Sequence, residues 1–84
     1  MPQVTRIGDM DNAYPIPDIS TEGSQNVFVN GLGIHRVGDK DSDDDTLSVG
    51  SATVMINGMA CGRLGDQDSD KEVMITASLN VFAG

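Results

Sequence analysis

Short apolar runs alternate with polar residues along this chain, and two of the runs end in the same dipeptide. Val27-Phe28-Val29 and Val54-Met55-Ile56 are rich in β-branched and large apolar residues, and Asn-Gly follows each of them. Asn-Gly tolerates positive φ at both central positions of a tight hairpin turn. The pattern predicts two hairpins, with return strands at 34–37 and 61–64. Apolar residues never recur at helical spacing over a useful window, so we predict an all-β fold.

The hairpins belong to a unit that occurs three times. The segment that begins at Gly23-Ser24 recurs at Gly50-Ser51 and again at Ala77-Ser78. A second element, Arg-x-Gly-Asp, also occurs three times, at Arg6/Asp9, Arg36/Asp39 and Arg63/Asp66. Self-similarity at a fixed period indicates a repeat architecture. We therefore predict one domain, residues 1–84, built from three β-hairpin repeats with long polar loops (about 1–31, 32–58 and 59–84) and related by an approximate threefold axis.

Each repeat divides into two faces, because side chains alternate across a strand. The mostly apolar face is assigned to the core and comprises Gln25, Val27, Val29, Ala52, Val54, Ile56, Leu79, Val81 and Ala83. The opposite face is polar, except for Phe28, Met55 and Phe82 at matched positions. Three matched apolar residues suit a trimeric partner, since a closed trimer presents one patch per subunit. The alternative is that these three side chains fill the middle of the fold.

Composition narrows the possible functions. A chain of 84 residues has a thin core, and its single cysteine, Cys61, excludes an internal disulfide, so a partner or a metal is expected to add stability. The net charge of −8 repels phosphate backbones, so we expect no nucleic-acid partner. No segment approaches the roughly 20 apolar residues that span a bilayer, and we expect no stable membrane insertion.

The combined motifs resemble the PAAR-repeat proteins over nearly the whole chain. In place of Pro-Ala-Ala-Arg stand Gln3-Val4-Thr5-Arg6, Gly33-Ile34-His35-Arg36 and Ala60-Cys61-Gly62-Arg63. The resemblance implies a small conical fold whose base caps a trimeric β-helical spike, one cap per trimer. It implies that the narrow end meets the target-cell envelope transiently during piercing.

The resemblance also implies a place in a contractile injection machine. The chain ends directly after its third repeat without an effector extension, which favours the spike tip of a phage-tail baseplate, assembled in the host cytoplasm and carried in the virion. The alternative is the bare tip of a tailocin or of a type VI secretion system, secreted on its spike.

Family members commonly bind zinc through three histidines and one cysteine in loops beyond Gly-Asp. Here the only such residues are His35 and Cys61, which lie before Gly-Asp and one register apart, so we do not expect this zinc site. The loops carry aspartates instead, and three converging loops could bind a hard cation such as calcium through oxygen. The alternative is a set of hydrated acidic turns. The candidate metal ligands are Asp11, Asp41, Asp43, Asp68, Asp70, His35 and Cys61.

The Arg-x-Gly-Asp elements are expected to be structural. Each arginine could pair with the aspartate of its element or with neighbouring backbone carbonyls and so tie the repeats together; the alternative is a set of exposed charges that stabilise little. An enzyme would have to use His35 and Cys61 as base and nucleophile, and their register argues against this, so we predict no catalysis. A free-standing cation-binding β-module is the remaining alternative.

Overall fold

The regular strands of the protein flank its two Asn-Gly turns. A computed structural model describes residues 1–84 and contains four short strands: β1 (Phe28–Val29), β2 (Leu32–Gly33), β3 (Met55–Ile56) and β4 (Met59–Ala60). β1 pairs antiparallel with β2, and β3 with β4. Between the strands, φ is 55° at both Asn30 and Asn57 and 77° and 81° at the glycines that follow. Both turn positions therefore use the left-handed conformation, and the all-β prediction is confirmed.

The return strands predicted at 34–37 and 61–64 are wrong. Each hairpin extends past its return strand by one hydrogen bond, as when Ile34 N–H donates to Val27 O at 3.1 Å. Beyond that point the chain pairs with other repeats, since Ile34 bridges Arg6 and Arg36 bridges Cys61. Residues with strand character thus pair across the molecule and not within their own hairpin.

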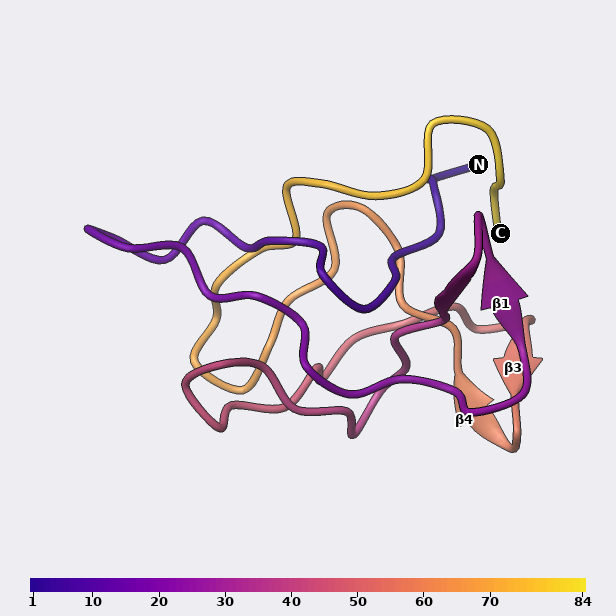
Figure 1. The fold of residues 1–84 in the computed structure, drawn as a ribbon, viewed down its shortest axis with the longest axis horizontal. Coiled ribbons are helices and arrows are strands. Elements are labelled where there is room, and N and C mark those ends of the chain that lie inside the picture. Colours follow the sequence, from indigo (N-terminus) through magenta and orange to yellow (C-terminus); the bar gives the residue numbers. More distant parts are fainter.

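The two ends of the chain together complete a third hairpin-like unit. Gln3 bridges Phe82, and Val4 N–H donates to Val81 O at 2.9 Å. This bond matches the one from Ile34 to Val27 in the first hairpin. Figure 1 shows both termini close together, at the end of the molecule that carries β1 and β3.

Backbone hydrogen bonds close the three units into a ring. Thr5 N–H donates to Gly62 O at 3.0 Å, Gly62 N–H to His35 O at 2.9 Å and His35 N–H to Thr5 O at 3.1 Å. The same cyclic order appears in the bridges Arg6–Ile34, Arg36–Cys61 and Arg63–Val4. The hydrogen bonds and bridges therefore follow the same cyclic order at three places in the chain.

The core lies just beside this ring. Its buried members are Val4, Val29, Ile34, Cys61 and Ala83, with Val27, Val54, Ile56 and Val81 packed against them. Three residues that the alternation assigned to the core face, Gln25, Ala52 and Leu79, are instead exposed, and Leu79 is 91% exposed. Strict alternation fails here because regular strand begins only after these positions.

Three buried serines start the hairpins. The Oγ atoms of Ser24, Ser51 and Ser78 accept the N–H groups of the residues two and three positions further on. A short side chain that bonds its own backbone in this way turns the chain and satisfies amides before pairing begins. This explains why the serines are at most 3% exposed although they belong to the polar face.

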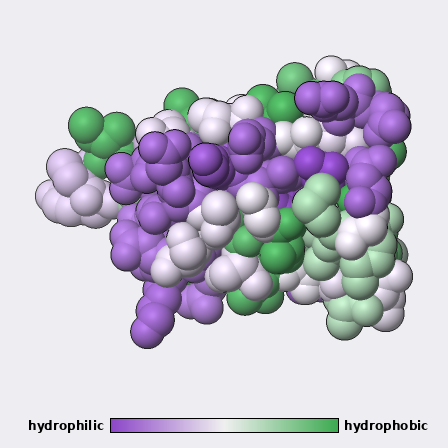
Figure 2. All heavy atoms as spheres, turned by 90° about the horizontal axis from the view of Figure 1, so that it is seen from below, coloured by the Kyte–Doolittle hydropathy of each residue, from purple (hydrophilic) through white to green (hydrophobic).

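The molecule has two different ends along its longest dimension of 30 Å. The hairpins and termini form one end, called the hairpin end, and the long loops around 9–20, 39–47 and 66–74 form the other, called the loop end (Figure 1). Figure 2 shows hydrophilic residues over much of the loop end, apolar residues at its far tip, and apolar beside hydrophilic surface at the hairpin end. The chain contains no apolar helix of membrane-spanning length.

Candidate functional site

The hairpin end exposes three large apolar side chains at matched positions. Phe28 in β1 is 58% exposed, Met55 in β3 is 55% exposed, and Phe82 beside the C-terminus is 47% exposed. They do not fill the middle of the fold, so that alternative is wrong.

Each Arg-x-Gly-Asp element forms a bidentate ion pair. The Nε–Oδ2 distances are 3.0 Å for Arg6–Asp9, 2.8 Å for Arg36–Asp39 and 3.1 Å for Arg63–Asp66. A second bond runs from Nη2 to Oδ1, and the arginine's own N–H also donates to Oδ2. These hydrogen bonds raise the pKa of each arginine above its ordinary value. The pairs are largely shielded from water, unlike surface pairs that stabilise little.

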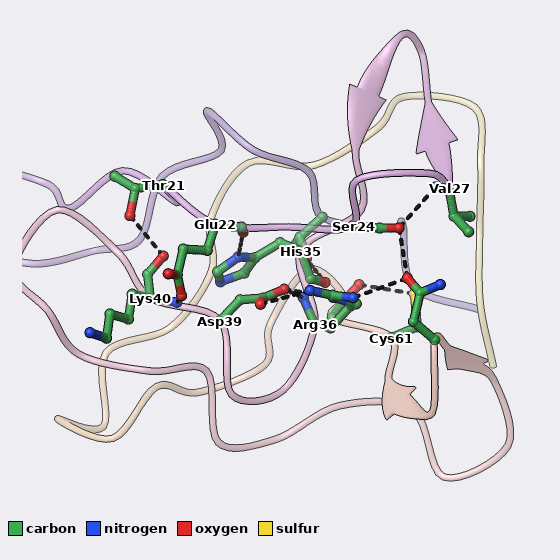
Figure 3. A network of polar contacts seen from close by, with 12 residues as sticks. Thr21, Glu22, Ser24, Val27, His35, Arg36, Asp39, Lys40 and Cys61 are labelled. Atoms are coloured by element: carbon green, nitrogen blue, oxygen red, sulfur yellow. Dashed lines mark hydrogen bonds and ion pairs between the residues drawn. The ribbon is translucent and has the colours of Figure 1, made fainter.

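Two of the arginines also reach a turn in another part of the ring. Arg36 Nη1 donates to Asn57 Oδ1 at 3.0 Å, and Ser24 Oγ donates to the same oxygen at 2.7 Å (Figure 3). Arg6 Nη1 bonds Asn30 Oδ1 in the same way. The asparagine that shapes each turn therefore also fixes it to the neighbouring unit.

His35 and Cys61 do not form a site together. His35 is 2% exposed, and its ring Nδ1–H donates to Glu22 O at 2.7 Å (Figure 3). Cys61 is 1% exposed and lies in the apolar core cluster, where burial raises the pKa of its thiol. A buried thiol with a raised pKa is a poor nucleophile and a poor metal ligand.

A polar cleft of about 1030 Å³ follows one flank of the molecule. It is lined by residues such as Ser24, Asn26 and Arg36, but by neither His35 nor Cys61. Its arginine and the aspartate beside it, Asp39, are already bonded to one another. The cleft therefore does not bring together His35 and Cys61, the one base and nucleophile pair considered from the sequence.

The loop end gathers three aspartates of equivalent position. Asp11, Asp41 and Asp68 are 2%, 8% and 5% exposed, so the expectation of hydrated acidic turns is wrong for them. One oxygen of each, Oδ1, accepts two backbone N–H groups of its own loop, as Asp68 does from Asp70 and Glu72, both at 2.9 Å.

Two other candidate ligands from the same loops lie apart from this cluster. Asp43 and Asp70 are exposed, and neither belongs to the groups of carboxylates that converge.

A second set of carboxylates joins the first. Carboxylate oxygens of Asp11, Asp18, Asp41 and Asp68 lie within 4.8 Å of one another, and so do those of Asp18, Asp45, Asp68 and Glu72. Sequence reasoning missed Asp18, Asp45 and Glu72. In two loops the sequence does contain a signal for these ligands, namely an acidic residue four positions after Asp41 and after Asp68. The first loop is longer and does not follow this spacing, because Asp18 lies seven positions after Asp11.

Crowding of these carboxylates shifts their protonation. Burial raises the pKa of Asp18 to about 6, with the charges of Asp11 and Asp41 adding to the effect. Burial and the neighbouring carboxylates, chiefly Asp11, raise the pKa of Glu72 to about 8. Burial also raises the pKa of Asp68. Each shift has the sign expected when anions are brought together away from water.

The residues present do not fit a zinc site of three histidines and a cysteine. His35 Nδ1 is bonded to a backbone carbonyl, and Cys61 lies in the apolar core. The converging side chains of the loop end are all carboxylates, so they offer only oxygen ligands. Zinc prefers nitrogen and sulfur ligands in four-coordinate geometry. The chain therefore departs from that pattern in ligand type as well as in number.

Comparison with known proteins agrees with the fold. The family model described as PAAR motif matches residues 11–70 of the 84. A search of curated proteins finds no match. The PAAR family comprises structural spike-tip proteins of contractile injection systems, and its members sit on the tips of trimeric spikes. With the matched residues covering most of the chain and the fold entirely β, the protein belongs to the PAAR-motif family.

Proposed function

We propose that this protein is a structural cap that closes the blunt end of a trimeric β-helical spike, one cap per trimer, and catalyses no reaction. The hairpin end is the surface that meets the spike, and the loop end leads into the target envelope. The protein would act by transmitting the thrust of a contracting sheath, for which rigidity is the useful property.

The observation that carries this proposal is the threefold order of the hydrogen bonds. Phe28, Met55 and Phe82 have matching bridge partners in the three units, and each is about half exposed, which supports a surface with three similar contacts. A trimer offers three identical patches, and a single chain can meet all of them only if its own contacts follow the same symmetry. Partly exposed aromatic and methionine side chains are common contact residues in interfaces.

The interior of the cap supports a mechanical role. Three bidentate Arg–Asp pairs lie at equivalent positions, and two of them connect onward to the turns of neighbouring units. The ring through Thr5, His35 and Gly62 ties the units at the axis. Load applied at one hairpin would therefore be shared by all three.

The test is to mix the protein with a trimeric β-helical spike fragment and measure stoichiometry by native mass spectrometry and affinity by titration. We expect one cap per three spike chains. Phe28→Ser should weaken binding about tenfold to hundredfold, because burying such a side chain contributes about 1.5–3 kcal/mol. Tyr14→Ser is the matched control, since Tyr14 is 95% exposed and lies in the first long loop at the other end.

Three caps per trimer, or equal losses in both variants, would refute the proposal. Spike fragments from a phage tail, a tailocin and a type VI system should be compared in parallel. The phage-tail origin predicted from the sequence requires that the phage fragment binds most tightly.

A further inference from the structure

The six converging carboxylates of the loop end, Asp11, Asp18, Asp41, Asp45, Asp68 and Glu72, form two tiers. In each loop the first aspartate uses Oδ1 to organise its own backbone, and its N–H donates to the carbonyl of the second acidic residue, at 3.0 Å for Asp11 and Asp18. The equivalent bonds join Asp41 to Asp45 and Asp68 to Glu72. Every loop thus delivers one inner and one outer carboxylate to the same place.

Four of the six carboxylates have a buried oxygen with no hydrogen-bond partner. Asp68 is 5% exposed and belongs to both converging groups, and its Oδ2 has no hydrogen-bond partner. Asp18 Oδ2, Asp45 Oδ2 and Glu72 Oε1 are likewise buried and unpartnered. None of the three ion pairs of the protein uses a carboxylate of this cluster. Buried polar atoms are nearly always satisfied, and buried charges are nearly always paired or bound to metal.

The geometry points to a hard divalent cation, of the calcium class, bound on the axis by these carboxylates: we propose Asp68 and Asp18 as its central ligands, completed by Asp11, Asp41, Asp45 and Glu72. The ligands are all oxygen, which is the preference of hard cations. Oxygens within 4.8 Å of one another can surround an ion at about 2.4 Å, which is a calcium–oxygen distance. Magnesium has shorter bonds of about 2.0–2.1 Å and demands near-octahedral geometry, which a set of crowded carboxylates from three loops supplies less readily.

Such an ion would join the three loops at the end that the hairpins do not hold. It would neutralise charge that now repels within the cluster. This inference does not depend on spike binding, because every residue involved lies in the loops and away from Phe28, Met55 and Phe82.

The test is isothermal titration of EDTA-treated protein with calcium chloride, alongside thermal melts in calcium, magnesium, manganese and zinc chlorides. We expect calcium to bind and to raise Tm by about 10 °C or more at a hundredfold excess over its Kd. Asp68→Asn should weaken calcium binding at least tenfold. It keeps the Oδ1 that holds its loop, so the variant is expected to fold.

Matched controls come from the same loops. Asp43→Asn and Asp70→Asn each remove one exposed negative charge outside the cluster and should leave calcium affinity within about twofold of wild type. Glu72→Gln, at a residue whose Oε1 has no hydrogen-bond partner, gives a second cluster variant should Asp68→Asn fail to fold. The proposal is overturned if no divalent cation binds, which would mean that protons alone satisfy the cluster. It is equally overturned if zinc binds more tightly than calcium, or if control and cluster variants lose affinity alike.

Discussion

Gly62 is the position where the closed ring leaves no room for a side chain. A Cβ at this residue would lie 2.5 Å from Thr5 Oγ1, 2.6 Å from His35 O and 2.6 Å from Leu47 Cδ2. All three distances are shorter than real Cβ contacts. Two of the three atoms belong to residues of the hydrogen-bonded ring, so relief requires the ring itself to open.

Gly62→Ala should therefore cost more than an ordinary surface substitution. Overpacking in a filled core costs about 1–3 kcal/mol, and lengthening a ring hydrogen bond adds about 1 kcal/mol. A loss of about 2–4 kcal/mol corresponds to a fall in Tm of roughly 10–25 °C for a domain of this size. This is a large share of the total stability of a small domain.

The assay is a thermal melt followed by circular dichroism, with urea unfolding for the free energy. Gly84→Ala is the matched control, because its Cβ would meet only Met1 Sδ at 3.6 Å and Thr53 Oγ1 at 3.7 Å, which are ordinary contacts. Thr5→Ala in the Gly62→Ala background should recover part of the loss by removing the closest atom. A Gly62→Ala protein that melts within about 3 °C of wild type would refute the packing of the three units around the axis.

Two further outcomes concern titrating groups. The Cys61 thiol is 1% exposed, and burial raises its pKa, so it should resist a thiol reagent at pH 8 in the native protein and react fully in denaturant. Reaction at the rate of a free thiol without denaturant would contradict the position of Cys61 in the core. In EDTA-treated protein, the pKa of Asp18 is raised to about 6 and that of Glu72 to about 8, so these groups hold protons more tightly folded than unfolded. Their contribution to the free energy of unfolding is therefore present at pH about 4 and is lost as pH rises to about 8. A Tm that rises across this range would contradict the crowding of these carboxylates.

The sequence predicted most reliably what is decided within a few residues. Asn-Gly after an apolar run indicated a tight turn, and both turns have positive φ at the asparagine and the glycine. The Arg-x-Gly-Asp spacing indicated possible ion pairs, and the pairs span three residues within one turn. Such features depend on local geometry, which a single sequence expresses directly.

What the sequence did not reveal depends on closure of the ring. Ile34 and Arg36 have strand character, yet their partners, Arg6 and Cys61, lie more than 20 residues away along the chain. Their local sequence indicates that the loop aspartates lie in solvated turns, but closure brings carboxylates of three loops within 4.8 Å of one another and buries Asp68. These aspartates are buried by contacts between units. The polarity of the residues within one unit does not predict such burial.

Closure also bears on why the three residues of the hydrogen-bonded ring differ from one another. Thr5, His35 and Gly62 occupy equivalent places, and the glycine has no room for even a methyl group because Thr5 Oγ1, the backbone oxygen of His35 and Leu47 Cδ2 fill the space. Three identical chains would have to put the same residue at all three places. A single chain can instead have side chains of different size at the three places. The backbone hydrogen bonds of the ring stay the same while the side chains differ. The residues that stand in place of Pro-Ala-Ala therefore differ between the repeats. Each Arg is the same in all three, because its partner aspartate lies within its own turn.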